Sequence, residues 1–274
     1  MKFYEYGNRN DPVVVLIHGI GMDVLQSFAK VIDDLHKDYH VVAVALDGYD
    51  GEKAGFSSIR EEARQIASYL RQGHGGKVEA ILGCDLGGAV TLDLALRELI
   101  EARTLILNGG YIKPKKGAVV YSKIYAYLYD ALMYGSDRFL TGLVIRIKLG
   151  YDLQRENLCR SAKFKTIENS ICAFMQYELP ENVEGLRASE VFYIYGTKEK
   201  SYVEGMRAMK SMCPSLRRVK TGAFSHNELM VTQPDVYARL VRRILNENKD
   251  TDLKKVGANG NDGGKNDGRN DGVA

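Results

Sequence analysis

Asp85 stands within Gly83-Cys84-Asp85-Leu86-Gly87-Gly88, a run whose glycine spacing is that of a nucleophile elbow. In such an elbow a sharp strand-to-helix turn raises one reactive side chain above a parallel sheet, and the usual occupant is the serine of G-x-S-x-G. The occupant here is an aspartate, which tolerates the positive φ of the turn better than most residues other than glycine. A carboxylate is already ionised at neutral pH and is an established covalent nucleophile, so we expect the chemistry to centre on Asp85.

Strand and helix patterns alternate on both sides of this turn. The runs Val13–Ile17 and Val41–Leu46 are continuously apolar and rich in valine, which is typical of strands buried on both faces of a parallel sheet. Further patterns predict strands at 78–82, 103–107, 191–195 and 216–220, and helices at 23–37, 58–71, 87–99, 202–212 and 234–246. This alternation predicts an α/β fold with a mostly parallel sheet and helices on both faces.

Residues 113–185 interrupt the alternation. They contain no convincing strand, are rich in helix formers and carry tyrosines at 121, 125, 127, 129 and 134. We expect them to form a helical lid inserted into an α/β core made of residues 1–112 and 186–248. Residues 249–274 are polar and repeat Asn-Asp-Gly. Because this tail cannot bury enough apolar surface to offset its ordering entropy, it is predicted to be disordered.

A second glycine-containing motif, His18-Gly19-Ile20-Gly21, directly follows the first long strand. With this motif and the elbow, the chain from about residue 3 to residue 248 resembles the α/β-hydrolase superfamily, as a lid-bearing member with aspartate in place of serine. The resemblance implies the α/β-hydrolase fold and a hydrolase activity. It also implies an oxyanion hole formed by the backbone amides of Ile20 and Leu86, with structural roles for His18, Gly19, Gly83 and Gly87.

The same resemblance implies a triad of Asp85, Glu199 and His226. Glu199 lies three residues past Gly196, where the superfamily commonly has its acid. His226 precedes the last predicted helix, where the superfamily keeps its histidine. The order of nucleophile, acid and histidine is also that of the superfamily. For Glu199 there is an alternative, a solvated carboxylate within the charged run of residues 198–200.

An aspartate nucleophile favours alkyl over acyl substrates. Attack on a carbon that bears a halide or an epoxide oxygen gives an ester of Asp85, which water activated by His226 and Glu199 would hydrolyse. Attack on an acyl carbon instead gives a mixed anhydride, a high-energy species that gains little over direct hydrolysis. Asn108, after the strand at 103–107, is a candidate contact for the leaving group, and a tyrosine of the lid is a candidate proton donor.

Families that carry out such chemistry have further characteristic residues, and this chain lacks some of them. Haloalkane dehalogenases commonly hold the halide with a tryptophan after the nucleophile, but this chain has Leu86 there and contains no tryptophan. Epoxide hydrolases commonly show H-G-x-P, and Gly21 replaces the proline. The residues on either side of Asp85 are most similar to those at the elbow of serine-type esterases and C–C hydrolases. Three hypotheses stay open for Asp85: a covalent nucleophile for an epoxide or halide, a general base or polar ligand, and an inactivating substitution in a ligand-binding protein.

Composition and charge exclude several other classes of protein. The 274 residues are 45% hydrophobic and 27% charged, as in an ordinary globular protein, and the net charge of +3 is too small to indicate a nucleic-acid partner. The four cysteines are widely spaced and form no Cys/His cluster, so we expect neither a disulfide framework nor a metal site.

The sequence contains no pattern of a signal peptide and no apolar run of membrane-spanning length. We therefore expect a cytoplasmic protein without stable membrane insertion. It would act on a small-molecule substrate and need no cofactor. Its oligomeric state does not follow from the sequence.

Overall fold

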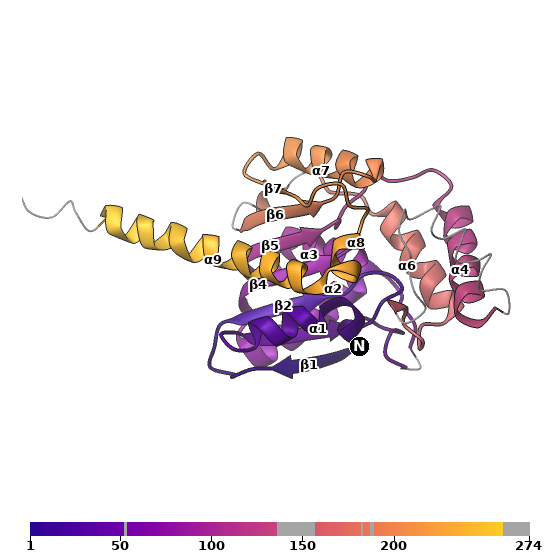
Figure 1. Ribbon diagram of the computed structural model, residues 1–274, viewed down its shortest axis with the longest axis horizontal. Helices are drawn as coiled ribbons and strands as arrows, with labels where there is room; N and C mark the ends of the chain where they lie inside the picture. Colours follow the sequence, from indigo (N-terminus) through magenta and orange to yellow (C-terminus); the bar gives the residue numbers. More distant parts are fainter. Residues whose placement is uncertain (52–53, 136–156, 182, 187–188, 260–274) are drawn as a thin grey trace, which may run out of the picture.

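The computed structural model describes residues 1–51, 54–135, 157–181, 183–186 and 189–259. Among them, seven strands form one sheet in the order β1-β3-β2-β4-β5-β6-β7, with helices on both sides (Figure 1). Strand β1 is antiparallel to β3, and every other neighbouring pair is parallel. The strands are β1 (Lys2–Tyr6), β2 (Val13–Ile17), β3 (His40–Ala45), β4 (Lys77–Cys84), β5 (Glu101–Asn108), β6 (Glu190–Tyr195) and β7 (Arg217–Lys220).

Two groups of helices cover the two faces of the sheet. On one face, α1 (Val24–Leu35) and α9 (Pro234–Asn259) pack together. On the other face lie α2 (Ile59–His74) and α3 (Leu86–Leu96). The other described helices are α4 (Ala118–Tyr134), α6 (Phe164–Gln176), α7 (Lys200–Met212) and α8 (Glu228–Thr232), with a short 3-10 helix at Glu184–Leu186. The arrangement confirms the predicted α/β class with helices on both faces.

The helix α2 begins and ends at capping signals in its sequence. The Ser58 hydroxyl accepts a hydrogen bond from the Glu61 N–H at 3.2 Å, which satisfies one of the unpaired amides of the first turn. Glu61 and Glu62 lie in that turn, where the positive end of the helix dipole favours acidic side chains. After the last turn, Gly75 adopts φ 66°, a left-handed conformation that favours glycine. The predicted start of this helix is therefore confirmed.

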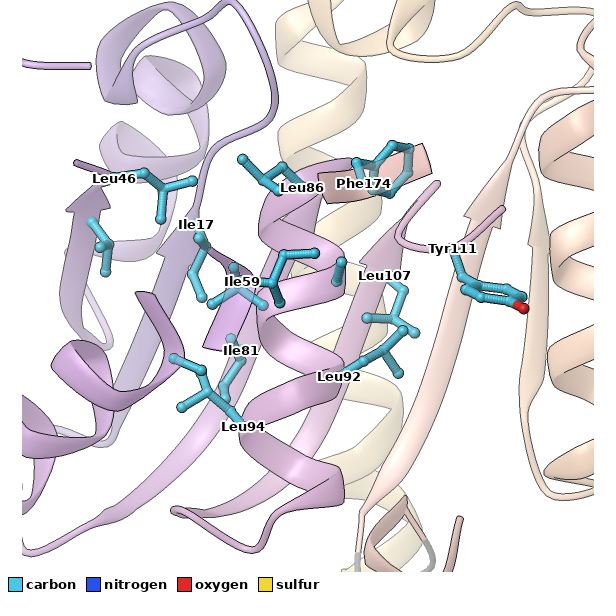
Figure 2. Packing of buried hydrophobic residues seen from close by; sticks show 14 of the residues in the cluster. Ile17, Leu46, Ile59, Ile81, Leu86, Leu92, Leu94, Leu107, Tyr111 and Phe174 are labelled. Atoms are coloured by element: carbon cyan, nitrogen blue, oxygen red, sulfur yellow. The ribbon is translucent and has the colours of Figure 1, made fainter. Parts of the chain in front are cut away.

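The helix α3 is buried on all sides, which fixes the turn that precedes it. Every residue from Leu86 to Ala95 is buried. Figure 2 shows Leu92 and Leu94 of this helix beside Ile81 and Leu107 of the adjacent strands. Burial of one such side chain contributes roughly 1.5–3 kcal/mol, so α3 cannot shift without losing packing on several sides. The core thus holds the reactive turn in place.

Two helices, α4 and α6, lie between β5 and β6 in the chain, within the segment predicted to form a lid. They pack against each other, and the Tyr129 hydroxyl of α4 donates a hydrogen bond to the Cys159 carbonyl. Residues 136–156 of the segment lie outside the described residues, so the extent of the lid remains a prediction. None of the helices described combines the length and apolar character that a membrane span requires.

At the two ends of the chain the structure differs from the predictions made from the sequence. The patterns do not predict β1, because this edge strand is only partly buried and carries polar residues instead of a continuous apolar run. The helix α9 extends to Asn259, past residue 248, where the predicted tail begins. Residues 260–274, the rest of the predicted tail, lie outside the described residues.

Candidate active site

Asp85 occupies a strained turn between β4 and α3. Its backbone adopts φ 47° and ψ −115°, and it is one of three non-glycine residues with positive φ among those described. Glycine is required on both sides of it. A Cβ atom on Gly83 would clash with the Gly87 carbonyl oxygen, and one on Gly87 would clash with the Ile17 carbonyl oxygen. These close approaches explain the glycine spacing of the elbow, and the strain is of the kind that proteins keep at functional sites.

The carboxylate of Asp85 is held by three side chains. Its Oδ1 atom forms an ion pair with Nε2 of His226 and accepts a hydrogen bond from the Tyr202 hydroxyl at 3.1 Å. Its Oδ2 atom accepts a hydrogen bond from Nδ2 of Asn227 at 2.8 Å. A Cβ on Gly19 would lie 2.6 Å from the same Oδ2, so only glycine lets the loop after β2 pass this closely. Segments distant in sequence therefore converge on one carboxylate.

His226 lies in the loop between β7 and α8, and two neighbours fix its ring. The ring of Tyr202 stacks on it, with centroids 3.9 Å apart and planes inclined by 18°. On another side lies Gly109, at φ 62°, where any Cβ would overlap the imidazole. Stacking and the absence of a side chain at Gly109 together direct Nε2 at Asp85. The predicted pair of Asp85 and His226 is thus in direct contact.

Three influences set the charge of His226. Burial lowers the pKa of the imidazole, but the carboxylate of Asp85, by its charge and its hydrogen bond, and the charge of Glu199 raise it. The raising effects are larger, so the pKa lies above its ordinary value. The ion pair therefore stabilises the fold below the unfolded pKa, and this contribution is lost as the pH rises through the raised pKa of the folded state.

Removal of the Asp85 charge is expected to lower the pKa of His226. In Asp85→Asn the burial penalty stays while the main opposing charge disappears, so the imidazole should lose its proton at a lower pH than in the wild type. The measurement is an NMR titration of the imidazole resonances. Glu199→Gln serves as the matched control and should lower the pKa less, because Glu199 acts on the ring without a hydrogen bond. An unchanged pKa in Asp85→Asn would contradict the assigned pairing.

Glu199 lies near the pair but is not connected to it. It is half-buried at the N-terminus of α7 and lines the same cavity as Asp85 and His226. Burial raises the pKa of Glu199, against a smaller opposing effect of His226. Among the described residues its carboxylate forms no hydrogen bond with His226. The structure thus brings the three predicted triad residues to one cavity, with only the Asp85–His226 contact formed.

His18 is hydrogen-bonded to the backbone through both of its ring nitrogens. The side chain is fully buried; Nδ1 donates to the Gly19 carbonyl at 2.8 Å, and Nε2 accepts from the Leu46 amide at 3.1 Å. Burial lowers the pKa of His18 to about 4, so the ring is neutral at pH 7. These bonds hold the loop that carries Ile20. Ile20 lines the cavity beside Asp85, and the oxyanion hole of the Ile20 and Leu86 amides stays a prediction.

Asn108 and Asn227 form a chain of hydrogen bonds that ends at Asp85. Nδ2 of Asn108 donates to Oδ1 of Asn227 at 3.1 Å, and Asn227 in turn donates to Asp85. Asn108 is buried and does not line the cavity next to Asp85, so it positions the site and is not placed to contact a leaving group. The pattern of the sequence gives no signal for Asn227 beyond its place next to His226. Tyr202 has only its place three residues after Glu199.

A cavity of about 270 Å³ opens above Asp85. It extends from the loop after β2 to the helices α4, α6 and α7. Most of its lining is apolar, and Asp85, Tyr202, His226 and Asn227 are among its polar residues. The residues around it are Ile20, Met22, Asp85, Ile112, Lys115, Tyr125, Leu158, Ile171, Phe174, Met175, Glu199, Ser201, Tyr202, His226 and Asn227. Its size and lining suit a small, largely apolar molecule.

The chain matches the model of a known family. Residues 14–240 fit the model of the alpha/beta hydrolase family, which covers most of the chain. The chain belongs to the alpha/beta hydrolase family. This places the protein among the hydrolases as a class and confirms the resemblance that the two glycine motifs indicate. It leaves the subclass open.

Solved alpha/beta hydrolases share the fold at low sequence identity. An alpha/beta hydrolase family protein from Desulfitobacterium hafniense is 22% identical, with a TM-score of 0.73, over 89% of this chain and 100% of the other. A carboxylesterase from Nitrososphaera gargenis is 19% identical, with a TM-score of 0.73, over 91% and 95%. The enol-lactonase from Burkholderia xenovorans is 15% identical, with a TM-score of 0.67, over 89% and 96%. Identities this low support the shared fold alone.

Proposed function

We propose that this alpha/beta hydrolase hydrolyses a small, largely apolar epoxide through an ester of Asp85. One observation carries the proposal: His226 and Tyr202 both contact Oδ1 of Asp85, and all three residues line the same largely apolar cavity. The three groups supply a nucleophile, a base for water and a proton donor. Each is needed once to open an epoxide and then cleave the ester.

The first step forms the ester. A carboxylate oxygen of Asp85 attacks an epoxide carbon, the carbon–oxygen bond of the ring breaks, and its electron pair moves to the epoxide oxygen. That oxygen takes the phenolic proton of Tyr202. Burial and the charge of Asp85 raise the pKa of Tyr202 well above its ordinary value, so the phenol is protonated before the reaction. The protonated His226, stacked on Tyr202, then returns a proton to the phenolate and becomes neutral.

The second step releases the diol. Once Asp85 is an ester its charge is gone, and the pKa of His226 falls because burial now dominates. The neutral imidazole takes a proton from a water molecule that attacks the ester carbonyl, while the amides of Ile20 and Leu86 stabilise the oxyanion. Collapse releases the product oxygen, which takes the proton of the Asp85 carboxylic acid. The ion pair of Asp85 and His226 is then restored.

An epoxide explains the site better than a halide or an acyl substrate. A halide needs donors that hold the leaving anion, yet the chain contains no tryptophan and has Leu86 after the nucleophile. An acyl substrate would give a mixed anhydride. An epoxide oxygen needs one proton, and the Tyr202 hydroxyl, at 3.1 Å from the nucleophile, is a suitable donor. Among the lid tyrosines, Tyr129 donates to the Cys159 carbonyl, and Tyr125 lines the cavity without a hydrogen bond to Asp85 among the described residues.

The test is the incorporation of ¹⁸O into Asp85. Under single turnover of a small aryl or aliphatic epoxide in ¹⁸O-water, the solvent oxygen is expected to enter the Asp85 carboxylate, because water attacks the ester carbonyl. Digestion and fragmentation mass spectrometry locate the label. Asp47, a buried carboxylate outside the cavity, is the internal control and should stay unlabelled. Turnover that leaves Asp85 unlabelled would contradict the nucleophile and favour a general-base role.

The second candidate is a ligand-binding protein that has lost the chemistry of its serine-bearing relatives. Two observations favour it. Both oxygens of Asp85 already have partners, and Glu199 forms no hydrogen bond with His226 among the described residues. Binding of an apolar ligand without turnover of any epoxide, halide or ester would support this alternative. Hydrolysis that disappears in His226→Ala would exclude it.

The proposed setting is the cytoplasm. The four cysteines are all unpaired, and three of them are buried. Free, buried thiols are typical of proteins in a reducing compartment. The partner implied by the cavity is a small molecule, and the proposed reaction needs water but no cofactor.

A further inference from the structure

Three metal-ligating side chains meet at one edge of the sheet. Glu5 lies on β1, His40 is the first residue of β3, and His74 is the last residue of α2. Nε2 of His40 is 3.4 Å from Oε2 of Glu5, and Nε2 of His74 is 3.4 Å from Oε1 of the same carboxylate. One ligand atom from each residue lies within 4.8 Å of the others. Because β3 begins here and Asp85 follows the end of the parallel β4, the cluster is remote from the candidate active site.

Three of the histidine nitrogens in this cluster have no hydrogen-bond partner among the described residues. His40 is only 1% exposed, and neither of its ring nitrogens forms a hydrogen bond with a described residue. The same holds for Nε2 of His74. A buried polar atom left without a partner costs roughly 1–3 kcal/mol, and native proteins rarely retain one without a reason. Both histidines direct Nε2 at the carboxylate of Glu5, at a separation that leaves room for an ion.

The separations fit a zinc ion. Zinc is bound tetrahedrally by imidazole and carboxylate at about 2.0–2.2 Å, which places neighbouring ligand atoms roughly 3.4 Å apart. Each imidazole Nε2 lies at that spacing from one oxygen of Glu5, His40 from Oε2 and His74 from Oε1, and one ligand atom from each of the three residues lies within 4.8 Å of the others. We propose that Glu5, His40 and His74 bind one Zn²⁺, with a water molecule as the fourth ligand. Two imidazoles and one carboxylate form a donor set that binds zinc in preference to magnesium or calcium.

The surroundings of Glu5 prepare it as a ligand. The Tyr69 hydroxyl donates to Oε1, and the Arg9 guanidinium donates to Oε2 at 2.7 Å. A carboxylate offers about four acceptor positions, so both bonds are compatible with metal binding and resemble the outer contacts that orient metal ligands. Arg9 is mostly exposed and can move away from the ion.

The proposed ion would act as a structural clamp. Its ligands come from the edge strand β1, from the strand β3 that pairs with it, and from the end of α2. A metal that binds only the folded chain stabilises it by an amount that grows with the logarithm of the free-metal concentration over Kd. No ligand is part of the chemistry at Asp85, so we expect the clamp to change thermal stability and not the reaction.

The experiment uses the full chain without a polyhistidine tag, stripped with a chelator and then titrated with Zn²⁺ in a calorimeter. The expected result is one zinc ion per chain and a rise in melting temperature with added zinc. Cobalt substitution should give the visible absorption of a four-coordinate site. His74→Gln is expected to abolish the stoichiometric binding, and Tyr69→Phe to weaken it about 10–100-fold, as for other outer-contact residues.

The matched control is His36→Gln. His36 lies near the same end of the sheet but binds the Ile32 carbonyl of its own helix through Nδ1, so this variant should bind zinc like the wild type. If His74→Gln does not fold, as judged by circular dichroism, Tyr69→Phe still tests the site. Absence of zinc binding by the wild type would overturn the proposal. Equal binding by the wild type, His74→Gln and Tyr69→Phe would overturn it as well.

Discussion

Replacement of His226 by glutamine is expected to stop turnover while Asp85 still forms its ester. Attack on the epoxide needs the carboxylate of Asp85 and the proton of Tyr202, and neither comes from His226 in that first event. Hydrolysis needs a base for water, which glutamine cannot supply. General bases of this kind contribute about 10²–10⁴-fold to a rate. The steady-state rate should fall by that factor, and the ester should accumulate.

Intact-mass spectrometry measures this outcome directly. After incubation with an epoxide, His226→Gln should gain the mass of one substrate molecule, and fragmentation should place the addition on Asp85. His36→Gln, a histidine outside the cavity, is the control and should show wild-type turnover without an adduct. The double variant with Asp85→Asn should form no adduct. If His226→Gln loses activity and Asp85 stays unmodified, His226 is needed before ester formation and the proposed order of steps is wrong.

The core of the fold could be predicted because its signals are local. Val13–Ile17 is a strand with the predicted bounds, and the turn at Asp85 follows from glycines within a few residues of it. A strand buried on both faces must be apolar throughout, and a turn with positive φ must have small neighbours, so both leave a clear trace in the sequence. Strand β1 leaves no such trace because its burial is partial.

The site could be predicted only in part because its contacts are long-range. The pairing of Asp85 with His226 follows from the order of motifs that the chain shares with its family. Tyr202 and Asn227 carry no motif, and their place at Asp85 depends on how α7 and the loop before α8 pack. The same reason hides the cluster of Glu5, His40 and His74, whose members lie far apart in the chain. Residues that come together only through tertiary packing have no characteristic spacing in the sequence, so the sequence alone does not reveal them.

Tyr202→Phe is expected to separate an epoxide substrate from a halide. Phenylalanine keeps the ring that stacks on His226 and removes only the hydroxyl that donates to Asp85. An epoxide oxygen that leaves without a proton is a poor leaving group, so the rate of epoxide opening should fall about 10²–10⁴-fold, the usual contribution of a general acid. A halide leaves as an anion without needing a proton. Slow turnover of a haloalkane, where it occurs, should therefore be little changed.

The comparison is made as the ratio of kcat/KM for a matched epoxide and bromoalkane. Tyr125→Phe is the control, because Tyr125 lines the same cavity and has no contact with Asp85 among the described residues. This control should leave the ratio unchanged. Equal losses for the two substrates in Tyr202→Phe would mean that the hydroxyl only positions Asp85. Full epoxide activity in that variant would remove Tyr202 from the mechanism, and with it the main reason for choosing an epoxide over a halide.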